Sequence, residues 1–147
     1  VKNRLMFGGK RRVGLFLPLK RGDDMTAEDM FELCTGLFGE SKSECAIWRD
    51  GFLAMLNGIL AECFDLEHGI REAGALEPLK EPLAVRAFGD EIDYDMSLLK
   101  TCVVWGVCAL LAVSDDDNVR AGYFNNKFEV GKVYALRGHW METEDCY

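Results

Sequence analysis

The side chains best spaced for metal chemistry are Glu62, Asp65, His68 and Glu72, near the middle of the chain. Asp65 and His68 have the i, i+3 spacing that carboxylate-bridged dimetal centres use on one helix face. Such a centre needs a second pair of this kind, and the other histidine, His139, lies outside the predicted helices. A small metal-dependent hydrolase or oxidase using these four residues is therefore an alternative, and a surface or interface role for His68 is favoured.

The six cysteines also suggest chemistry, but their spacing contains no C-x-x-C pair. With two histidines in the chain, no zinc ligand set of ordinary spacing can be assembled. Five cysteines lie among apolar residues in predicted helices, which is typical of reduced, buried thiols in a cytosolic protein. The six are Cys34, Cys45, Cys63, Cys102, Cys108 and Cys146.

Two acidic stretches, residues 90–95 and 115–118, are interpreted as solvent-exposed and helix-capping residues. The second stretch lacks the glycine and the distal glutamate of a calcium loop. The chain has neither a P-loop nor a dinucleotide-binding fingerprint. We therefore predict no catalytic, cofactor-binding or metal-binding residue, and expect a protein that is not an enzyme.

Charge divides the 147 residues at Gly22. Residues 1–22 carry seven Lys or Arg and no acidic residue, whereas the remainder carries 10 basic against 25 acidic residues, a net charge of 10 − 25 = −15. A body this acidic repels a phosphate backbone, so nonspecific binding to nucleic acid is not expected of it. Residues 1–24 are either a basic arm or an extended translation start, and the sequence leaves both open.

Neither apolar stretch of the sequence has the length of a membrane span. Residues 13–19 are too few for a secretory signal, and residues 101–113 fall short of the roughly 20 residues that cross a bilayer. We expect a soluble protein without membrane contact.

Capping residues and apolar spacing predict four helices. The first runs from Ala27, capped by Thr26, to a stop at Gly39; the second runs from Ser43 as its cap to Cys63 and continues, bent or as a short helix, over residues 65–71. Its polar face is expected to stay in solvent.

Gly74, Pro78, Pro82 and Gly89 exclude a long regular element from residue 74 to residue 95, although residues 83–88 could form a short extended strand. Asp95 caps a third helix that is apolar almost all round and belongs at the centre of the bundle. Gly106 in this helix would let a neighbour approach closely.

The fourth helix is predicted from about residue 116 to Arg137, with Gly138 ending it. Its expected core face consists of Val119, Tyr123, Phe124, Phe128, Val130 and Tyr134. The predicted fold is mainly all-α: a small four-helix bundle at residues 25–138, with a long loop between helices two and three and a tail at residues 139–147.

Several local strings from residue 25 to about residue 136 resemble the head-tail connector (adaptor) proteins of tailed bacteriophages. The strings are LAECFDL at 60–66 leading to IR at 70–71, EPL at 77–79 followed by Pro82 and Val85, DEIDYD at 90–95, WGVCALLA at 105–112, DDDN at 115–118, and the residues Arg120, Ala121, 123–125 and 127–129. Residues 1–24 have no counterpart in that family.

This resemblance implies a virion assembly protein, present in the host cytoplasm during assembly, that forms a homo-oligomeric ring between the portal protein and a stopper or tail protein. DNA would pass through an acidic lumen without specific binding. We expect the long loop to supply the subunit interface and the tail to dock on another ring. The interface residues would be Leu83, Val85, Phe88, Ile92 and Tyr94, and the docking residues Trp140, Met141 and Tyr147.

Three alternatives remain open from the sequence: another phage neck or tail-completion protein, the metal-dependent enzyme above, and a host regulator that binds a partner helix through the tail aromatics. For the loop, packing over its own bundle is as well supported as subunit contact.

Overall fold

The computed structural model describes residues 24–144, with side chains up to Arg137 apart from that of Lys42. The described residues form an all-α bundle, which confirms the predicted fold class. The helices are α1 (Ala27–Phe38), α2 (Lys42–Cys45), α3 (Arg49–Glu62), α4 (Phe64–Ala73), α5 (Met96–Leu98), α6 (Val104–Ser114) and α7 (Asn118–Glu144).

Capping chemistry sets the ends of α1 as the sequence predicts. The Thr26 side chain accepts from the Asp29 N–H, and the Asp29 carboxylate accepts from the Thr26 N–H, which together form a capping box. Gly39 follows the last turn with φ 71°, a left-handed conformation that glycine adopts without steric cost. The first helix therefore begins and ends at the predicted residues.

The second predicted helix is divided into three parts. Ser41, rather than Ser43, forms the capping box with Glu44, so the predicted cap was wrong by two residues. A 3₁₀ turn at Ala46–Trp48 then joins α2 to α3, and it leaves Ile47 76% exposed. The predicted continuation beyond Cys63 is present as α4.

The central helix contains a π-helical segment at Leu99–Val103 between α5 and α6. Asp95 caps its start, as predicted, by accepting from the Leu98 N–H at 3.1 Å. The whole run Met96–Ser114 is long and apolar enough to span a membrane by length and composition, but 61% of that window is buried in the bundle. The apolar stretch counted from the sequence, residues 101–113, was therefore shorter than this helical run. Its burial in the bundle is what identifies the run as a core helix.

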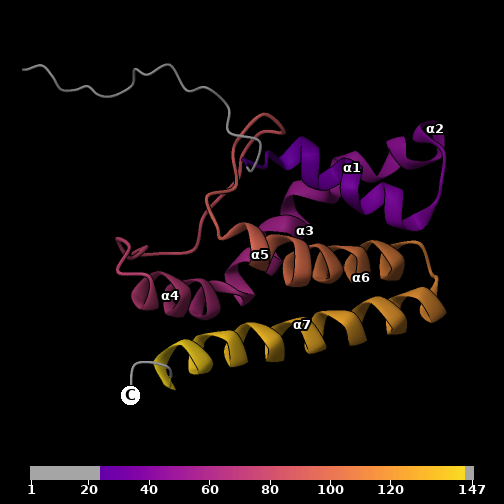
Figure 1. The fold of residues 1–147 in the computed structure, drawn as a ribbon. Coiled ribbons are helices and arrows are strands. Elements are labelled where there is room, and N and C mark those ends of the chain that lie inside the picture. Colours follow the sequence, from indigo (N-terminus) through magenta and orange to yellow (C-terminus); the bar gives the residue numbers. More distant parts are fainter. Residues whose placement is uncertain (1–23, 145–147) are drawn as a thin grey trace, which may run out of the picture.

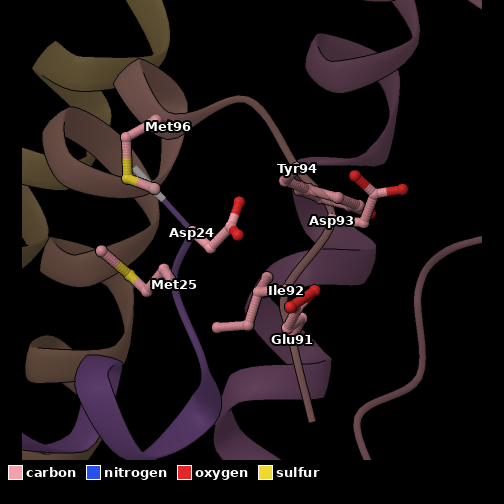
Figure 2. A pocket seen from close by; sticks show the side chains of 7 residues that line it. All are labelled: Asp24, Met25, Glu91, Ile92, Asp93, Tyr94 and Met96. Carbon is pink, nitrogen blue, oxygen red and sulfur yellow. The ribbon is translucent and has the colours of Figure 1, made fainter. Parts of the chain in front are cut away.

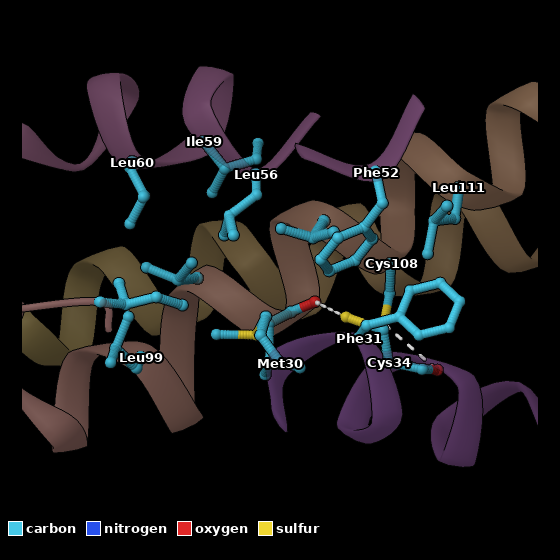
Figure 3. Packing of buried hydrophobic residues seen from close by; sticks show 14 of the residues in the cluster. Met30, Phe31, Cys34, Phe52, Leu56, Ile59, Leu60, Leu99, Cys108 and Leu111 are labelled. Atoms are coloured by element: carbon cyan, nitrogen blue, oxygen red, sulfur yellow. Dashed lines mark hydrogen bonds between the residues drawn. The ribbon is translucent and has the colours of Figure 1, made fainter. Parts of the chain in front are cut away.

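The helices pack in layers around this central run (Figure 1). α1 and α3 contact one side of α6, while α7 runs along the other side of α6 and the π segment, with α4 beside it. The core between α1, α3 and α6 contains the completely buried side chains Met30, Phe52, Leu56 and Leu111 (Figure 3). Truncating one of these to alanine typically costs about 2–5 kcal/mol.

Two cysteines contribute to this core as small apolar side chains. Cys34 contacts the Val104 carbonyl at 3.9 Å through its thiol, and the Cys108 thiol contacts the Cys34 carbonyl at the same distance (Figure 3). Burial raises the pKa of the Cys34 thiol above its ordinary value. The five cysteines of the described chain, Cys34, Cys45, Cys63, Cys102 and Cys108, are free and buried, as the sequence predicts.

The last helix differs from its prediction at both its face and its end. Phe124 and Phe128 are buried, but Val119, Tyr123, Val130 and Tyr134 are exposed, so most of the predicted core face was wrong. The helix contacts the bundle along one side only. Apolar residues on the opposite side of the helix from Phe124 and Phe128 therefore face outward. Gly138 does not end it, because α7 continues to Glu144.

Candidate functional site: the loop and the outer face of the last helix

The loop at residues 74–95 is held at both ends by one arginine on α4. Arg71 donates from Nη1 to the Glu77 carbonyl at 3.1 Å and from Nη2 to the Asp93 carbonyl at 2.6 Å. Its Nε donates to the Glu67 carboxylate at 2.8 Å. The planar guanidinium thus joins the start of the loop, the end of the loop and the helix, which a lysine cannot do.

Glu67 is the buried acidic residue in this network, with 2% of its surface exposed. Its second carboxylate oxygen accepts from the Asp95 N–H at 2.6 Å, at the residue that caps the central helix. Burial raises the pKa of Glu67, against the hydrogen bonds from Asp95 and Arg71, which lower it. The loop therefore returns to the bundle at a fixed point set by α4.

Asn57 holds the middle of the loop. Its amide nitrogen donates to the Val85 carbonyl at 2.8 Å, and its amide oxygen accepts from the Val85 N–H at 2.8 Å. This side chain satisfies both backbone groups that a neighbouring strand would otherwise satisfy. No strand forms at residues 83–88 or elsewhere in residues 24–144, and the polar face of α3, predicted to lie in solvent, holds the loop instead.

The loop also supplies hydrogen-bond acceptors to N–H groups in the first turn of α1. The Ala27 N–H donates to the Asp90 carbonyl at 2.9 Å, and the Glu28 N–H donates to the Phe88 carbonyl at 2.8 Å. The Asp90 side chain in turn accepts from two loop N–H groups. First-turn N–H groups have no partner inside their own helix, so the loop completes α1.

Phe88 fixes the loop against an aromatic cluster with Phe31 and Phe52. Its ring centroid lies 5.8 Å from that of Phe31 and 5.9 Å from that of Phe52. The guanidinium of Arg49 lies 4.0 Å from the Phe88 centroid and forms a two-pronged ion pair with Glu28 at 2.9 and 2.8 Å. The loop is therefore anchored by packing as well as by hydrogen bonds.

These contacts show where the predicted subunit-interface residues lie, and the interface itself stays a prediction. Val85, Ile92 and Tyr94 are buried in their own chain, and Tyr94 donates its hydroxyl to the Leu60 carbonyl at 2.8 Å. Leu83 and Phe88 are half-buried against the same core. Side chains buried inside their own subunit present little surface to a neighbour, so the outer surface of the loop is formed by its other residues.

A hollow of about 460 Å³ lies between the end of the loop and the start of the central helix (Figure 2). Its floor includes Met25, Ile92 and Met96, and the carboxylates of Asp24, Glu91 and Asp93 border it. No lysine or arginine of the described chain lines this hollow. Its charge favours cationic side chains over anions.

The outer face of α7 is a feature that the sequence reasoning missed. We define it as the side of α7 turned away from the bundle. Its exposed apolar side chains are Val119, Tyr123, Val130, Val133, Tyr134 and Leu136. Val119 is 85% exposed and Tyr134 is 64% exposed, and an open groove of about 310 Å³ runs along residues 129–137. The apolar residues of this segment occupy two sides of the helix, one that is buried and one that is exposed. Assigning all of them to one core face concealed the exposed side.

Of the predicted docking residues, Trp140 and Met141 lie in the last turns of α7 rather than in a tail. Tyr147 lies outside the described residues, as does the basic segment before Asp24. The docking prediction therefore stays a prediction.

The described side chains offer no assembled reactive centre. Among the side chains described up to Arg137, no group of three His, Cys, Asp or Glu is placed to hold a metal ion. His68 Nε2 lies 3.7 Å from Glu72, and both residues are substantially exposed. Cys63 and Cys102 lie with their sulfurs 3.9 Å apart inside the core, and their hydrogen bond raises the pKa of Cys63 and lowers that of Cys102.

The chain was compared with models of known protein families, with characterised proteins and with solved structures. None of the three comparisons found a match.

Proposed function

We propose that this chain is a structural assembly protein of a tailed bacteriophage, a head-tail connector subunit that forms a ring between the portal and a stopper or tail protein. The observation that carries the proposal is the outer face of α7, an apolar surface several turns long on a body whose loop is firmly tied down. Monomeric soluble proteins rarely expose contiguous apolar patches of this kind unless a partner covers them.

The placement of the polar side chains supports an assembly role over catalysis. Glu67, Arg71 and Asn57 have chemistry that an active site uses, yet each forms hydrogen bonds that position the loop. The resulting building block is stiff, which lowers the entropy cost of joining a ring.

The charge of the body is consistent with a channel for DNA. Residues 23–147 carry a net charge of −15, which repels a passing phosphate backbone and keeps DNA from adhering to the wall. In this proposal the protein resides in the virion and, before assembly, in the host cytoplasm.

The test is co-expression of the chain with the portal protein of the same phage, followed by purification through the portal and cryo-electron microscopy. We expect a ring of this chain beneath the portal. A position elsewhere in the neck would replace the connector assignment by another neck or tail-completion role. A chain that neither co-purifies with the portal nor occurs in virions would overturn the proposal.

A further inference from the structure

The outer face of α7 has a charge opposite to that of the rest of the body. The exposed charged side chains on this face are Lys127 and Arg137 against Glu129, a net charge of 2 − 1 = +1, because Arg120 and Lys132 are half-buried and pair with Glu40, Asp117 and Glu62. Lys127, Glu129 and Arg137 are exposed beside the apolar side chains of this face. Two copies of the face brought together would place like charges opposite one another, which disfavours a symmetric contact between two α7 helices.

The loop has the complementary character. Residues 74–95 contain six acidic and two basic residues, a net charge of 2 − 6 = −4. Leu76 is 60% exposed, and Glu77 and Glu81 are exposed on either side of the half-buried Leu79. The first half of the loop, with Glu77 and Glu81 against Lys80, thus has a net charge of 1 − 2 = −1 beside its apolar residues, opposite in sign to the outer face of α7.

The two surfaces lie on different sides of the subunit. In Figure 1, α4 and α5 separate the loop from α7, so one copy cannot bring its own loop onto the outer face of its own α7. The loop is also held by Arg71, Asn57 and the start of α1, so it is presented as a fixed shape.

We propose that the outer face of α7 of one copy binds the loop (residues 74–95) of a second copy, with Lys127 and Arg137 opposite the carboxylates of Glu77 and Glu81. This inference rests on the proposed function and names the surfaces through which the ring closes. Because the two surfaces differ, each bound copy still presents one free face and one free loop, and such head-to-tail contacts generate rings when the rotation closes.

The extent of α7 suits this contact. A helix of 27 residues is about 40 Å long, and a stable interface buries about 800 Å² on each partner. Residues 1–22 also contain an apolar run, at residues 13–19, but their seven basic residues would be repelled by Lys127 and Arg137. Charge therefore favours the acidic loop of a second copy as the occupant.

A charge exchange tests the contact. The double substitution K127E and R137E and the double substitution E77K and E81K are each expected to weaken self-association of the full chain by about tenfold or more in sedimentation equilibrium. The chain carrying all four substitutions is expected to return to within about threefold of the original affinity, because the opposite charges face each other again.

An apolar pair of variants supplies the matched control. Val130→Glu on the outer face is expected to abolish self-association. Ile47→Glu, on the 3₁₀ turn, is expected to leave it unchanged although Ile47 is the more exposed of the two, at 76% against 43%. Circular dichroism and thermal unfolding of each variant establish that it is folded.

Several results would overturn the inference: a wild-type chain that stays monomeric at the highest concentration it reaches, a fourfold variant no tighter than either double variant, or equal effects of Val130→Glu and Ile47→Glu. A chain that stays monomeric but still co-purifies with the portal would overturn this contact and would not contradict the proposed function. Self-association through these surfaces without portal binding would support the contact and contradict the proposed function.

Discussion

Arg71 is the residue on which the geometry of the loop depends most directly. Its guanidinium donates to Glu67, Glu77 and Asp93, which lie on α4, at the start of the loop and at its end. The partner Glu67 is buried and has the Asp95 N–H as its other hydrogen-bond donor. Such a network stabilises one conformation strongly only when every member is satisfied.

We expect Arg71→Ala to lower the free energy of unfolding by about 3 kcal/mol, because it leaves the Glu67 carboxylate buried without its charged partner. Arg71→Lys keeps the charge but loses the planar fork, so its loss should be smaller. Urea unfolding monitored by circular dichroism measures both. A loss for Arg71→Ala no greater than that of Arg71→Lys would show that the fork does not hold the loop.

Glu67 should make stability depend on pH in a defined direction. Burial raises its pKa above the ordinary value of 4.5, so the folded chain favours the protonated carboxyl. The stabilisation that this preference gives the fold is fully present below pH 4.5 and is lost as the pH rises through the folded-state pKa. Glu67→Gln cannot titrate, so the stability advantage of the wild type over this variant should shrink as the pH rises above 4.5 and through the raised pKa of Glu67. An advantage that grows with pH would mean that the ion pair with Arg71 outweighs burial.

At the scale of elements, the position of α7 depends on two glycines. A Cβ on Gly106 would lie 3.0 Å from Ile59 and Phe128 side-chain atoms, and a Cβ on Gly131 would lie 2.3 Å from the Thr101 carbonyl oxygen. The α7 backbone thus lies directly against the π segment of the central helix. The close approach at Gly106 was expected from the sequence, and that at Gly131 was not.

Gly131→Ala is expected to destabilise the fold by about 1–3 kcal/mol, since the backbone of either α7 or the π segment must move. Gly122→Ala is the matched control on the same helix: it has no neighbour within 4 Å, so it should stabilise by up to about 1 kcal/mol through helix propensity. Thermal unfolding compares the two. Effects of the same sign would contradict the close packing of α7.

For the whole molecule, the division of charge decides how the chain meets nucleic acid. The acidic body surrounds a largely apolar core that begins at Met25, and the seven basic residues of residues 1–22 precede it. The two parts have opposite electrostatic preferences for a phosphate backbone.

Removing residues 1–23 should therefore abolish any binding of the chain to duplex DNA at about 0.1 M salt, because no large basic surface remains. Fluorescence anisotropy with a labelled duplex measures this. Retained binding by the shortened chain would show that the basic residues of α7 overcome the acidic body.

Local chemistry explains what could be predicted from the sequence. The caps at Thr26 and Asp95, the stop at Gly39, the short helix after Cys63 and the apolar central helix depend on residues within one or two turns of each other. The wrong predictions, a cap at Ser43 and a helix end at Gly138, also concern helix termini. There, several neighbouring residues are equally able to cap or end the helix.

An all-α chain, its buried central helix, its buried cysteines and its division of charge could be predicted from the sequence, because these features depend on composition and on spacing along one helix. Three features became visible only in the folded chain: Asn57 and Arg71 hold the loop, one side of α7 stays uncovered, and three loop residues belong to the core. These core residues are Val85, Ile92 and Tyr94. Those outcomes depend on contacts between residues far apart in the chain, and the apolar spacing of a helix is the same whether its second side meets a neighbouring helix or solvent.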